Sequence, residues 1–339
     1  MTAFPHLRAA LMSAPWAIEQ GRLEAIVEVV ERRIDGTRLS AEEIALIKGE
    51  RQPNGVVSLF GLNARTGAVE ARQERSSPAA GSAVAVINVM GIIAQHASQV
   101  DDISGPGGTS TERVSQSLNK ALADPSVGSI VLNFDSPGGS VSGVQALANE
   151  IYRARGRKPI VAQVNSLAAS AAYWIASSAD EIVMTPGALA GSIGVYALHA
   201  DVSKAADKAG FKFTYISAGK FKVEGNQFEP LGDDAFAAQK KIIDAYYSDF
   251  TSGVARGRGV AVDRVRSGFG EGRVVKDNEA VKQGMADRVA TLDATLQQLI
   301  AGKKPSAAPG KSASRHSVGI AADADMRARR HRLRLKAKA

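Results

Sequence analysis

PIVAQVNSLAASAAYWIASSA, from Pro159 to Ala179, is the stretch on which the fold prediction depends. It opens with an apolar, β-branched run, Ile160 to Val164, the pattern of a buried parallel strand. A turn is expected at Asn165-Ser166, and the small apolar residues from Leu167 to Ala179 predict a buried helix. Ser170 is therefore expected near a strand-to-helix junction, where free N–H groups suit a developing oxyanion. A serine in such a helix more often only permits close packing, so other stretches must decide its role.

Composition limits the possible chemistry. The 339 residues are 45% hydrophobic, enough for a large core, and include no cysteine. A thiolate nucleophile, a disulfide and a cysteine-bound metal are therefore excluded. The longest apolar run, Val84 to Ala94, is about half a membrane span, and the N-terminus shows no charged-then-apolar leader. We therefore expect a soluble, cytoplasmic protein with no signal peptide and no transmembrane segment.

The net charge of +8 belongs to the C-terminus. Residues 301–339 hold 11 Lys or Arg and 2 Asp, a balance of +9, so the other 300 residues sum to −1. The linker composition from Ala301 to Gly310 predicts disorder. The 7 basic residues between Arg327 and Lys338 are either a solvated tail or a nonspecific contact for nucleic acid or another anion.

Three regions are expected along the chain. Residues 1–75 read as a helical N-terminal region, because apolar residues recur at helical spacing from Ile18 to Ile34 and a capping box at Ser40 opens a helix from Ala41 to Lys48. A polar link at 71–82 then leads into a core domain, residues 76–300, and residues 301–339 form the disordered basic tail.

Strands and helices alternate through residues 83–300, which predicts a mainly parallel α/β layer fold. Strands are expected at 83–91, 129–134, 160–164, 181–184 and 213–217, and helices at 111–122, 141–155, 233–256 and 291–300, with a further helix ending near Gly210. The segment His96 to Thr111 is rich in Gly, Ser, Asp and Pro and is expected to be a mobile loop. Residues 187–195 read as a glycine-punctuated crossover.

The turn Asp135-Ser136-Pro137-Gly138-Gly139-Ser140 follows one of these strands. Two adjacent glycines let backbone N–H groups approach a ligand closely and can form a nest for an anion or oxyanion. By itself this signal is weak, because most Gly-Gly turns are only turns. The chain has no GxxxxGK[ST] pattern, which disfavours a nucleotide phosphate loop.

Two kinds of base could serve a serine nucleophile. Of the five histidines, only His199 lies inside the core pattern, where a lone histidine is more often structural. The other base is a lysine whose amine is held neutral by burial near apolar groups. Lys222 follows Phe221 and could reach inward, whereas neighbouring Lys220 is expected to be exposed.

These motifs occur in a fixed order: SPGG, NSLAASAAYWIA, GSIGV and SAGKFKVEGN. In that order they resemble the signal-peptide-peptidase A (SppA) family of serine–lysine peptidases, within the ClpP/crotonase superfamily. The resemblance covers residues 83–295 and is strongest to the capsid-assembly (prohead) proteases of lambda-type tailed phages. It implies a ClpP/crotonase-like layered β-α superhelix core and needs neither a cofactor nor a metal.

The resemblance also implies roles for individual residues. Ser170 matches the nucleophile, Lys222 the general base and Ser192 the serine that orients the lysine. The Gly138-Gly139 turn and the N–H of Ala171 match the oxyanion hole. The Lys-Val-Glu-Gly-Asn context favours Lys222 over Lys220, although the spacing departs by one residue from the commoner pattern. Where the family often has Gly-Gly after the nucleophile, this chain has Ala171-Ala172.

The function implied is a Ser–Lys endopeptidase that cleaves scaffold, portal or capsid proteins during phage procapsid maturation, assembled as a homo-oligomeric ring in the host cytoplasm or procapsid interior. Three alternatives remain. A bacterial SppA-like peptidase would degrade peptides. A crotonase-like site would bind acyl-CoA without needing a serine nucleophile. A non-enzymatic shell component would use only the basic tail, a reading that intact Ser170, Lys222 and Ser192 disfavour.

Overall fold

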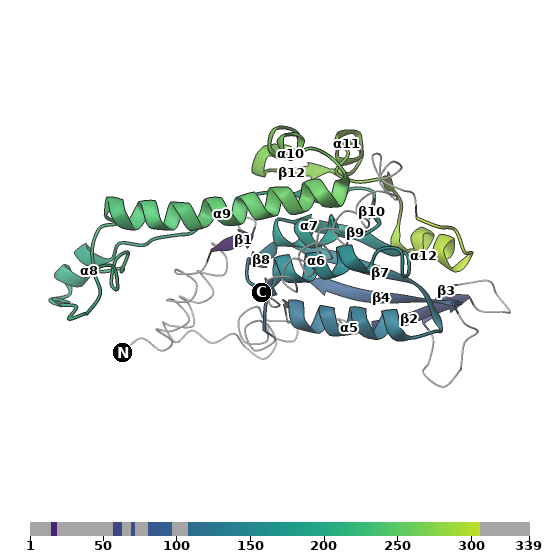
Figure 1. Ribbon diagram of the computed structural model, residues 1–339, viewed down its shortest axis with the longest axis horizontal. Coiled ribbons are helices and arrows are strands. Elements are labelled where there is room, and N and C mark those ends of the chain that lie inside the picture. Colours follow the sequence, from purple (N-terminus) through teal and green to yellow (C-terminus); the bar gives the residue numbers. More distant parts are fainter. Residues whose placement is uncertain (1–14, 19–56, 63–68, 72–80, 97–107, 306–339) are drawn as a thin grey trace, which may run out of the picture.

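The computed structural model describes residues 15–18, 57–62, 69–71, 81–96 and 108–305 (Figure 1). Its main feature is a nine-stranded sheet. The strands are β2 (Val57–Leu62), β3 (Val69–Ala71), β4 (Ala83–Met90), β7 (Val127–Ser136), β9 (Ile160–Ala169), β10 (Glu181–Met184), β11 (Leu189–Gly191), β12 (Val274–Lys276) and β13 (Arg288–Val289). The order β12-β11-β9-β7-β4-β2-β3 runs across the sheet, and β10 pairs with both β9 and β13.

The centre of the sheet is parallel. Strands β4, β7 and β9 pair in parallel, and β9 pairs in parallel with β10 along its first half and with β11 along its second. Helices connect these strands: α5 (Thr111–Ala123) precedes β7, α6 (Val144–Ala154) precedes β9, and α7 (Ala171–Ala176) precedes β10. Parallel neighbours need such crossovers. The predicted layered β-α core is therefore confirmed.

A second, smaller sheet lies against the first. It contains β1 (Trp16–Ile18), β8 (Gly138–Ser140), β5 (Ile93–Ala94) and β6 (Thr109–Ser110), in the order β1-β8-β5-β6. Strand β8 is the second half of the glycine turn after β7. The turn thus carries the chain from the large sheet into the small one, close to the beginning of α7 (Figure 1).

Apolar side chains cover both faces of the central strands. On β4, Ala85, Ile87 and Val89 belong to the large core cluster that includes α5, α6 and α7, while Val84 and Val86 belong to a smaller cluster under α12 (Leu292–Ile300). Alternating residues of a strand point to opposite faces. A strand buried on both faces reads as a continuous apolar run, which is the pattern that the sequence shows.

Helix α9 (Asp233–Arg258) is the longest in the described part of the chain. Its C-terminal half is buried against α7, where Phe250 stacks on Trp174 with ring centroids 4.8 Å apart. Its N-terminal half extends away from the body together with α8 (Ser203–Lys208) (Figure 1). We call residues 203–245 the projection. The closing section adds α10 (Val262–Gly268), a 3-10 turn (Gly270–Gly272) and α11 (Asp277–Gln283).

Several helix predictions are confirmed by α5, α6, α9 and α12, whose bounds differ by only a few residues from those expected. The helices expected over 19–34 and 41–48, most of the loop at 96–111 and the tail from 306 lie outside the described residues. Within residues 1–75, the described segments are strands, not helices. Strands β2 and β3 continue the main sheet beyond β4 in antiparallel pairing. The division into three regions stays a prediction.

Two local predictions are wrong. No turn occurs at Asn165-Ser166, because β9 continues to Ala169 and its second half finds a ladder partner in β11, with Leu167 opposite Leu189. The polar pair that suggested a turn instead forms side-chain hydrogen bonds with residues outside β9. Thr185 donates to the Asn165 side chain at 3.3 Å, and Ser166 donates to Asp135. Residues 213–217 are not a strand. They lie on the projection, away from any sheet that could pair with them.

The contact between α9 and α7 leaves no room for a side chain at Gly257. A Cβ there would lie 2.1 Å from the Ser177 carbonyl oxygen, a backbone atom that cannot move aside easily. Gly257→Ala should therefore destabilise the protein by about 1–3 kcal/mol through overpacking. Thermal unfolding followed by circular dichroism measures this effect. The matched control is Gly268→Ala, also helical, where the nearest atoms belong to a flexible arginine side chain at 3.5 Å or more. An equal loss in both variants would contradict the close-approach explanation.

Candidate active site

Ser170 occupies a strained junction between β9 and α7. Its backbone has φ 54° and ψ −117°, a conformation that favours glycine, and its side chain makes no capping bond to the helix. The Ser170 N–H donates to the Gly191 carbonyl at 2.7 Å, and the hydroxyl lies 3.4 Å from the Gly194 carbonyl. The residue is 1% exposed. Strain at a serine on a strand-to-helix turn is also found at the nucleophiles of hydrolases, although here the rest of the chain covers Ser170.

The glycine turn lies beside this junction. A Cβ on Gly138, which has φ 99°, would lie 3.1 Å from the Ala171 nitrogen, and a Cβ on Gly139 would lie 1.9 Å from the Ile93 carbonyl oxygen. Both positions therefore require glycine. The Gly138 N–H donates to the Ser136 hydroxyl at 3.2 Å, whereas Gly139 is a ladder residue of β8. The Gly138 N–H is therefore engaged within the turn itself.

Ser192 lies on the neighbouring strand end. It follows β11, whose Gly191 is in register with Ala169 of β9, so Ser192 and Ser170 leave adjacent strands at the same edge. Ser192 also has a positive φ, 52°, and its N–H donates to the Arg273 carbonyl at 2.9 Å. The structure thus brings Ser170, Ala171, Gly138, Gly139 and Ser192 into one region.

The predicted base is not part of this cluster. Lys222 is exposed and lies in the turn between α8 and α9, on the projection that extends away from α7 (Figure 1). Lys220 lies over the Phe221 ring at 4.6 Å, so it occupies a separate position. His199 is half-buried at the base of the projection, and its Nε2 atom has no hydrogen-bond partner. Within one chain, the residues predicted to form the nucleophile and the oxyanion hole lie together, and the predicted lysine base does not lie with them.

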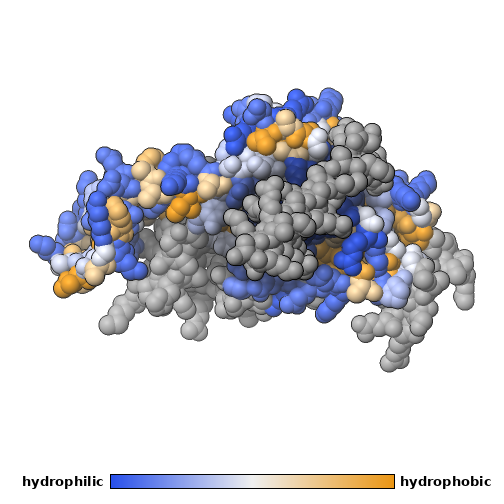
Figure 2. Space-filling view, in the orientation of Figure 1, coloured by the Kyte–Doolittle hydropathy of each residue, from blue (hydrophilic) through white to orange (hydrophobic). Residues whose placement is uncertain are grey.

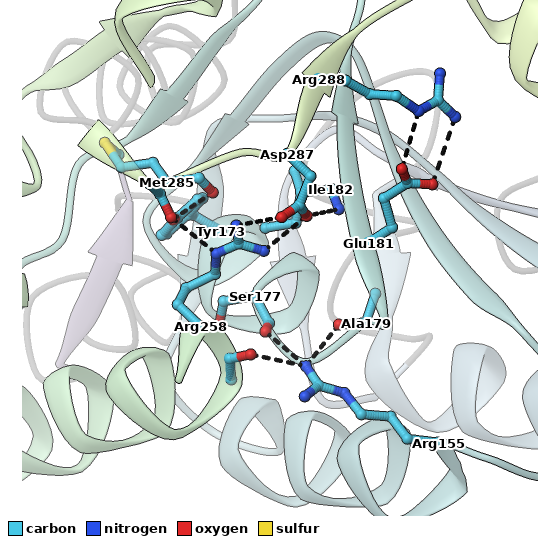
Figure 3. Close-up of polar contacts among 12 residues, drawn as sticks. Arg155, Tyr173, Ser177, Ala179, Glu181, Ile182, Arg258, Met285, Asp287 and Arg288 are labelled. Atoms are coloured by element: carbon cyan, nitrogen blue, oxygen red, sulfur yellow. Dashed lines mark hydrogen bonds and ion pairs between the residues drawn. The ribbon is translucent and has the colours of Figure 1, made fainter. Parts of the chain in front are cut away.

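The half-buried Arg155 anchors the C-terminal end of α7 (Figure 3). Arg155 donates to the carbonyl oxygens of Ser178, Ser177, Ala179 and Gly257 at 2.8, 3.1, 2.5 and 3.1 Å. The last carbonyls of a helix have no partner within it, and a cation satisfies them well. Arg155 therefore joins α6, the end of α7 and α9 through one side chain.

A second anchor joins α9 to the strand after α7. Arg258, 1% exposed, forms a two-pronged ion pair with Asp287 at 2.8 and 2.9 Å, and Asp287 also accepts the Ile182 N–H at 2.7 Å (Figure 3). Nearby, the Tyr173 hydroxyl donates to the Met285 carbonyl at 2.9 Å, and burial raises the pKa of this phenol. The phenol is thus a neutral structural donor. It fixes α7 three residues beyond Ser170.

Neither arginine stands out in the sequence as an anchor. Arg155 ends a helix and Arg258 precedes a glycine, and both patterns usually describe exposed C-terminal helix residues. One available signal was the small-residue spacing Gly253 and Gly257 on α9, which predicts close contact with another element. An arginine beside such a contact becomes buried with it.

Comparison with known proteins bears on this geometry. Residues 153–305 match the model of peptidase family S49, a span that contains Ser170, Ser192 and Lys222. The chain is 34% identical over 206 residues to the head-tail preconnector protein GP5 of Enterobacteria phage P21, and 33% identical over 206 residues to the capsid assembly protease C of Escherichia phage lambda. The expected resemblance to SppA-like peptidases and phage capsid assembly proteases is confirmed.

These matches cover 61% of this chain but only 40% and 46% of the two relatives. Among solved structures, a ClpP1 N165D mutant from Listeria monocytogenes superposes with a TM-score of 0.40 at 14% identity, covering 62% of this chain and 94% of that one. No helix among the described residues is long and apolar enough to cross a membrane. In the same residues, no group of three or more His, Asp or Glu could hold a metal ion.

Strain at Ser170 predicts an unusual stability order. Ser170→Gly should be more stable than Ser170→Ala by about 1–3 kcal/mol, because glycine adopts this backbone conformation without penalty and alanine does not. Urea unfolding compares the two variants. Ser177, in ordinary helical geometry at φ −61° and ψ −17°, is the control site. There the glycine variant should be the less stable by about 1 kcal/mol. The same order at both sites would contradict the strain.

Loss of the Arg155 anchor should loosen α7. Arg155→Met leaves several buried carbonyl oxygens without donors and should cost about 3 kcal/mol. Arg157→Met, two residues along on an exposed position, should change stability by less than about 0.5 kcal/mol. Urea unfolding of both variants provides the measurement, and similar losses would show that the four carbonyl contacts matter little.

Proposed function

We propose that this chain, whose residues 153–305 carry a peptidase S49 domain, is a serine endopeptidase with Ser170 as nucleophile. The observation that carries the proposal is the strained Ser170 at the β9–α7 junction, set beside the Ala171 N–H and the glycine turn. A serine held this way can attack a carbonyl while two backbone donors receive the oxyanion.

We assign Lys222 as the general base, acting on Ser170 of a neighbouring copy. Within one chain Lys222 is exposed on the projection, so the two groups of the dyad can meet only through a second chain or a large rearrangement. The projection exposes large apolar side chains, as a surface that packs against another protein does. They are Phe211, Phe213, Tyr215, Ile216, Phe221, Phe236 and Ile242 (Figure 2 shows part of this apolar surface).

A second copy is the simplest partner for this surface. A head-to-tail contact, in which one chain's projection covers the next chain's α7 region, generates a closed ring when the rotation closes. Such a contact would bury the apolar side chains around Lys222 and bring an amine to Ser170. Burial near apolar groups favours the neutral form of an amine, which is the form that accepts a proton.

The reaction then follows in order. The neutral lysine takes the Ser170 proton as the oxygen attacks a peptide carbonyl, and the backbone donors of Gly139 and Ala171 hold the oxyanion. The lysine gives the proton to the leaving amine, and water hydrolyses the acyl-enzyme. We assign Ser192, at the adjacent strand end, the role of orienting the incoming lysine. No cofactor or metal is needed for these steps.

The substrates that we propose are scaffold, portal or capsid proteins of a maturing phage procapsid. The support is the similarity to a phage capsid assembly protease and a phage head-tail preconnector protein. The sequence alone leaves open a bacterial housekeeping peptidase. Co-expression with the capsid and portal proteins encoded beside this chain distinguishes the two, because only the first reading predicts discrete cuts in those proteins.

Substitutions at the proposed dyad should abolish cleavage. Ser170→Ala and Lys222→Ala should each lower the rate of substrate cleavage by on the order of a thousandfold or more. Lys220→Ala and His199→Ala are the matched controls and should retain activity. Intact-mass analysis of co-expressed substrates provides the readout. Loss of activity in His199→Ala with a working Lys222→Ala would replace the lysine by a histidine base, and normal activity in Ser170→Ala would remove the peptidase assignment.

A mixing experiment tests the shared site directly. Chains carrying only Ser170→Ala and chains carrying only Lys222→Ala are co-expressed in equal amounts. If each site takes its serine and its lysine from different copies, about a quarter of the sites are intact and activity returns to about that fraction of wild type. If both groups come from one chain, every site lacks one of them and the mixture stays inactive.

A further inference from the structure

Strand β1 lies between the glycine turn and the segment after Ser192. It pairs antiparallel with β8: Trp16 lies opposite Ser140, Ala17 opposite Gly139, and Ile18 opposite Gly138. On its other edge, the Trp16 N–H donates to Tyr196 at 2.8 Å and the Tyr196 N–H donates back at 3.0 Å. The chain's own residues 15–18 are thus held as an extended strand on both sides.

The pairing fixes which carbonyl faces the site. In an antiparallel strand, successive residues direct their N–H and C=O groups to opposite edges. Trp16 uses both groups on Tyr196, so Pro15 and Ala17 face β8, and the Val141 N–H donates to the Pro15 carbonyl at 3.5 Å. The Ala17 carbonyl therefore points toward Gly139, the proposed oxyanion donor.

The Ala17 carbonyl and the Ala171 nitrogen both lie close to Gly138. The point that a Gly138 Cβ would occupy is 2.3 Å from the Ala17 carbonyl oxygen and 3.1 Å from the Ala171 nitrogen. Both atoms thus border one small space next to Ser170. The side chains fit closely, since Ala17 is 0% and Ile18 3% exposed. A larger residue in place of Ala17 would have no free volume.

Pairing an extended segment between two strand edges is a general mode of peptide recognition, in which backbone bonds give affinity and side-chain space gives specificity. We propose that residues 15–18 occupy the position of a substrate peptide and that the chain cleaves itself between Ala17 and Ile18. This inference rests on the proposed Ser170 peptidase activity. It also names the substrate class: extended segments with a small residue immediately before the cut.

The chemistry balances without a further reactant except water. The Ser170 oxygen bonds to the Ala17 carbonyl carbon, its proton passes to the lysine base, and the Ala17–Ile18 bond breaks as that proton moves to the Ile18 nitrogen. Water then attacks the ester. Its hydroxide leaves with Ala17 as a carboxylic acid, and its proton returns to the Ser170 oxygen. The products are residues 1–17 and a chain that begins at Ile18.

Purified full-length protein tests the inference by intact mass and N-terminal sequencing over time, with denatured casein as an independent substrate. Wild type should convert to a chain beginning at Ile18, and Ser170→Ala should stay whole. Ala17→Gly should still be cut, while Ala17→Trp should resist. Because Ala17→Trp could disturb folding, wild type is also given two free peptides spanning residues 11–22. The peptide carrying Ala17→Trp should be cut on the order of a hundredfold more slowly than the natural one.

The outcomes separate the two claims. If wild type cleaves casein but keeps its own N-terminus, or cuts itself elsewhere, the self-cleavage inference is overturned and the peptidase assignment stands. In that case β1 only covers the site. If wild type cleaves neither casein, the peptides nor itself, the peptidase assignment fails and the inference fails with it. Conversion to a chain starting at Ile18 in Ser170→Ala would overturn the role given to Ser170.

Discussion

The hydrogen bond from the Ser170 N–H to the Gly191 carbonyl, 2.7 Å long, connects the ends of two parallel strands at the point where one of them becomes a helix. It helps hold Ser170 at a positive φ, a conformation that a non-glycine residue adopts only when its surroundings compel it. The adjacent pairing between β9 and β11 constrains the backbone in this way. Without it, the chain could relax at Ser170, and the hydroxyl and the Ala171 N–H would lose their fixed relation.

Close backbone approach provides the rest of the rigidity. Gly138 and Gly139 bring the turn against Ala17 and Ile93, and Gly253 and Gly257 bring α9 against α7, each at distances that exclude a Cβ. Contacts this tight cannot slide without breaking packing. Arg155 and the Arg258–Asp287 pair then satisfy the polar groups that such packing buries. The proposed nucleophile therefore lies at the start of a short helix that is fixed at both ends.

The sequence predicted this half of the molecule well, for identifiable reasons. A β-branched run followed by small residues has few interpretations other than a buried strand entering a buried helix, so Ser170 was placed correctly although the expected turn at Asn165 was wrong. Adjacent glycines at 138 and 139 predicted a close backbone approach. The three-residue strand at Trp16 could not be predicted, since it is too short to show periodicity and its partners are more than a hundred residues away. The position of Lys222 also escaped prediction, because motif order along a chain does not report distance in space.

Both unusual features of the site concern its control. The proposed lysine lies on a projection that a single chain leaves exposed, so chemistry would begin only when copies assemble. Residues 15–18 of the same chain occupy the proposed substrate position beside Ser170. A tethered segment competes at a high effective concentration against any free substrate. Once copies assemble, the peptidase would first cleave residues 15–18, and only release of the cleaved segment would open the substrate position to other proteins. A peptidase built this way couples its activity to its own assembly, and the order of events follows from geometry without a separate inhibitor.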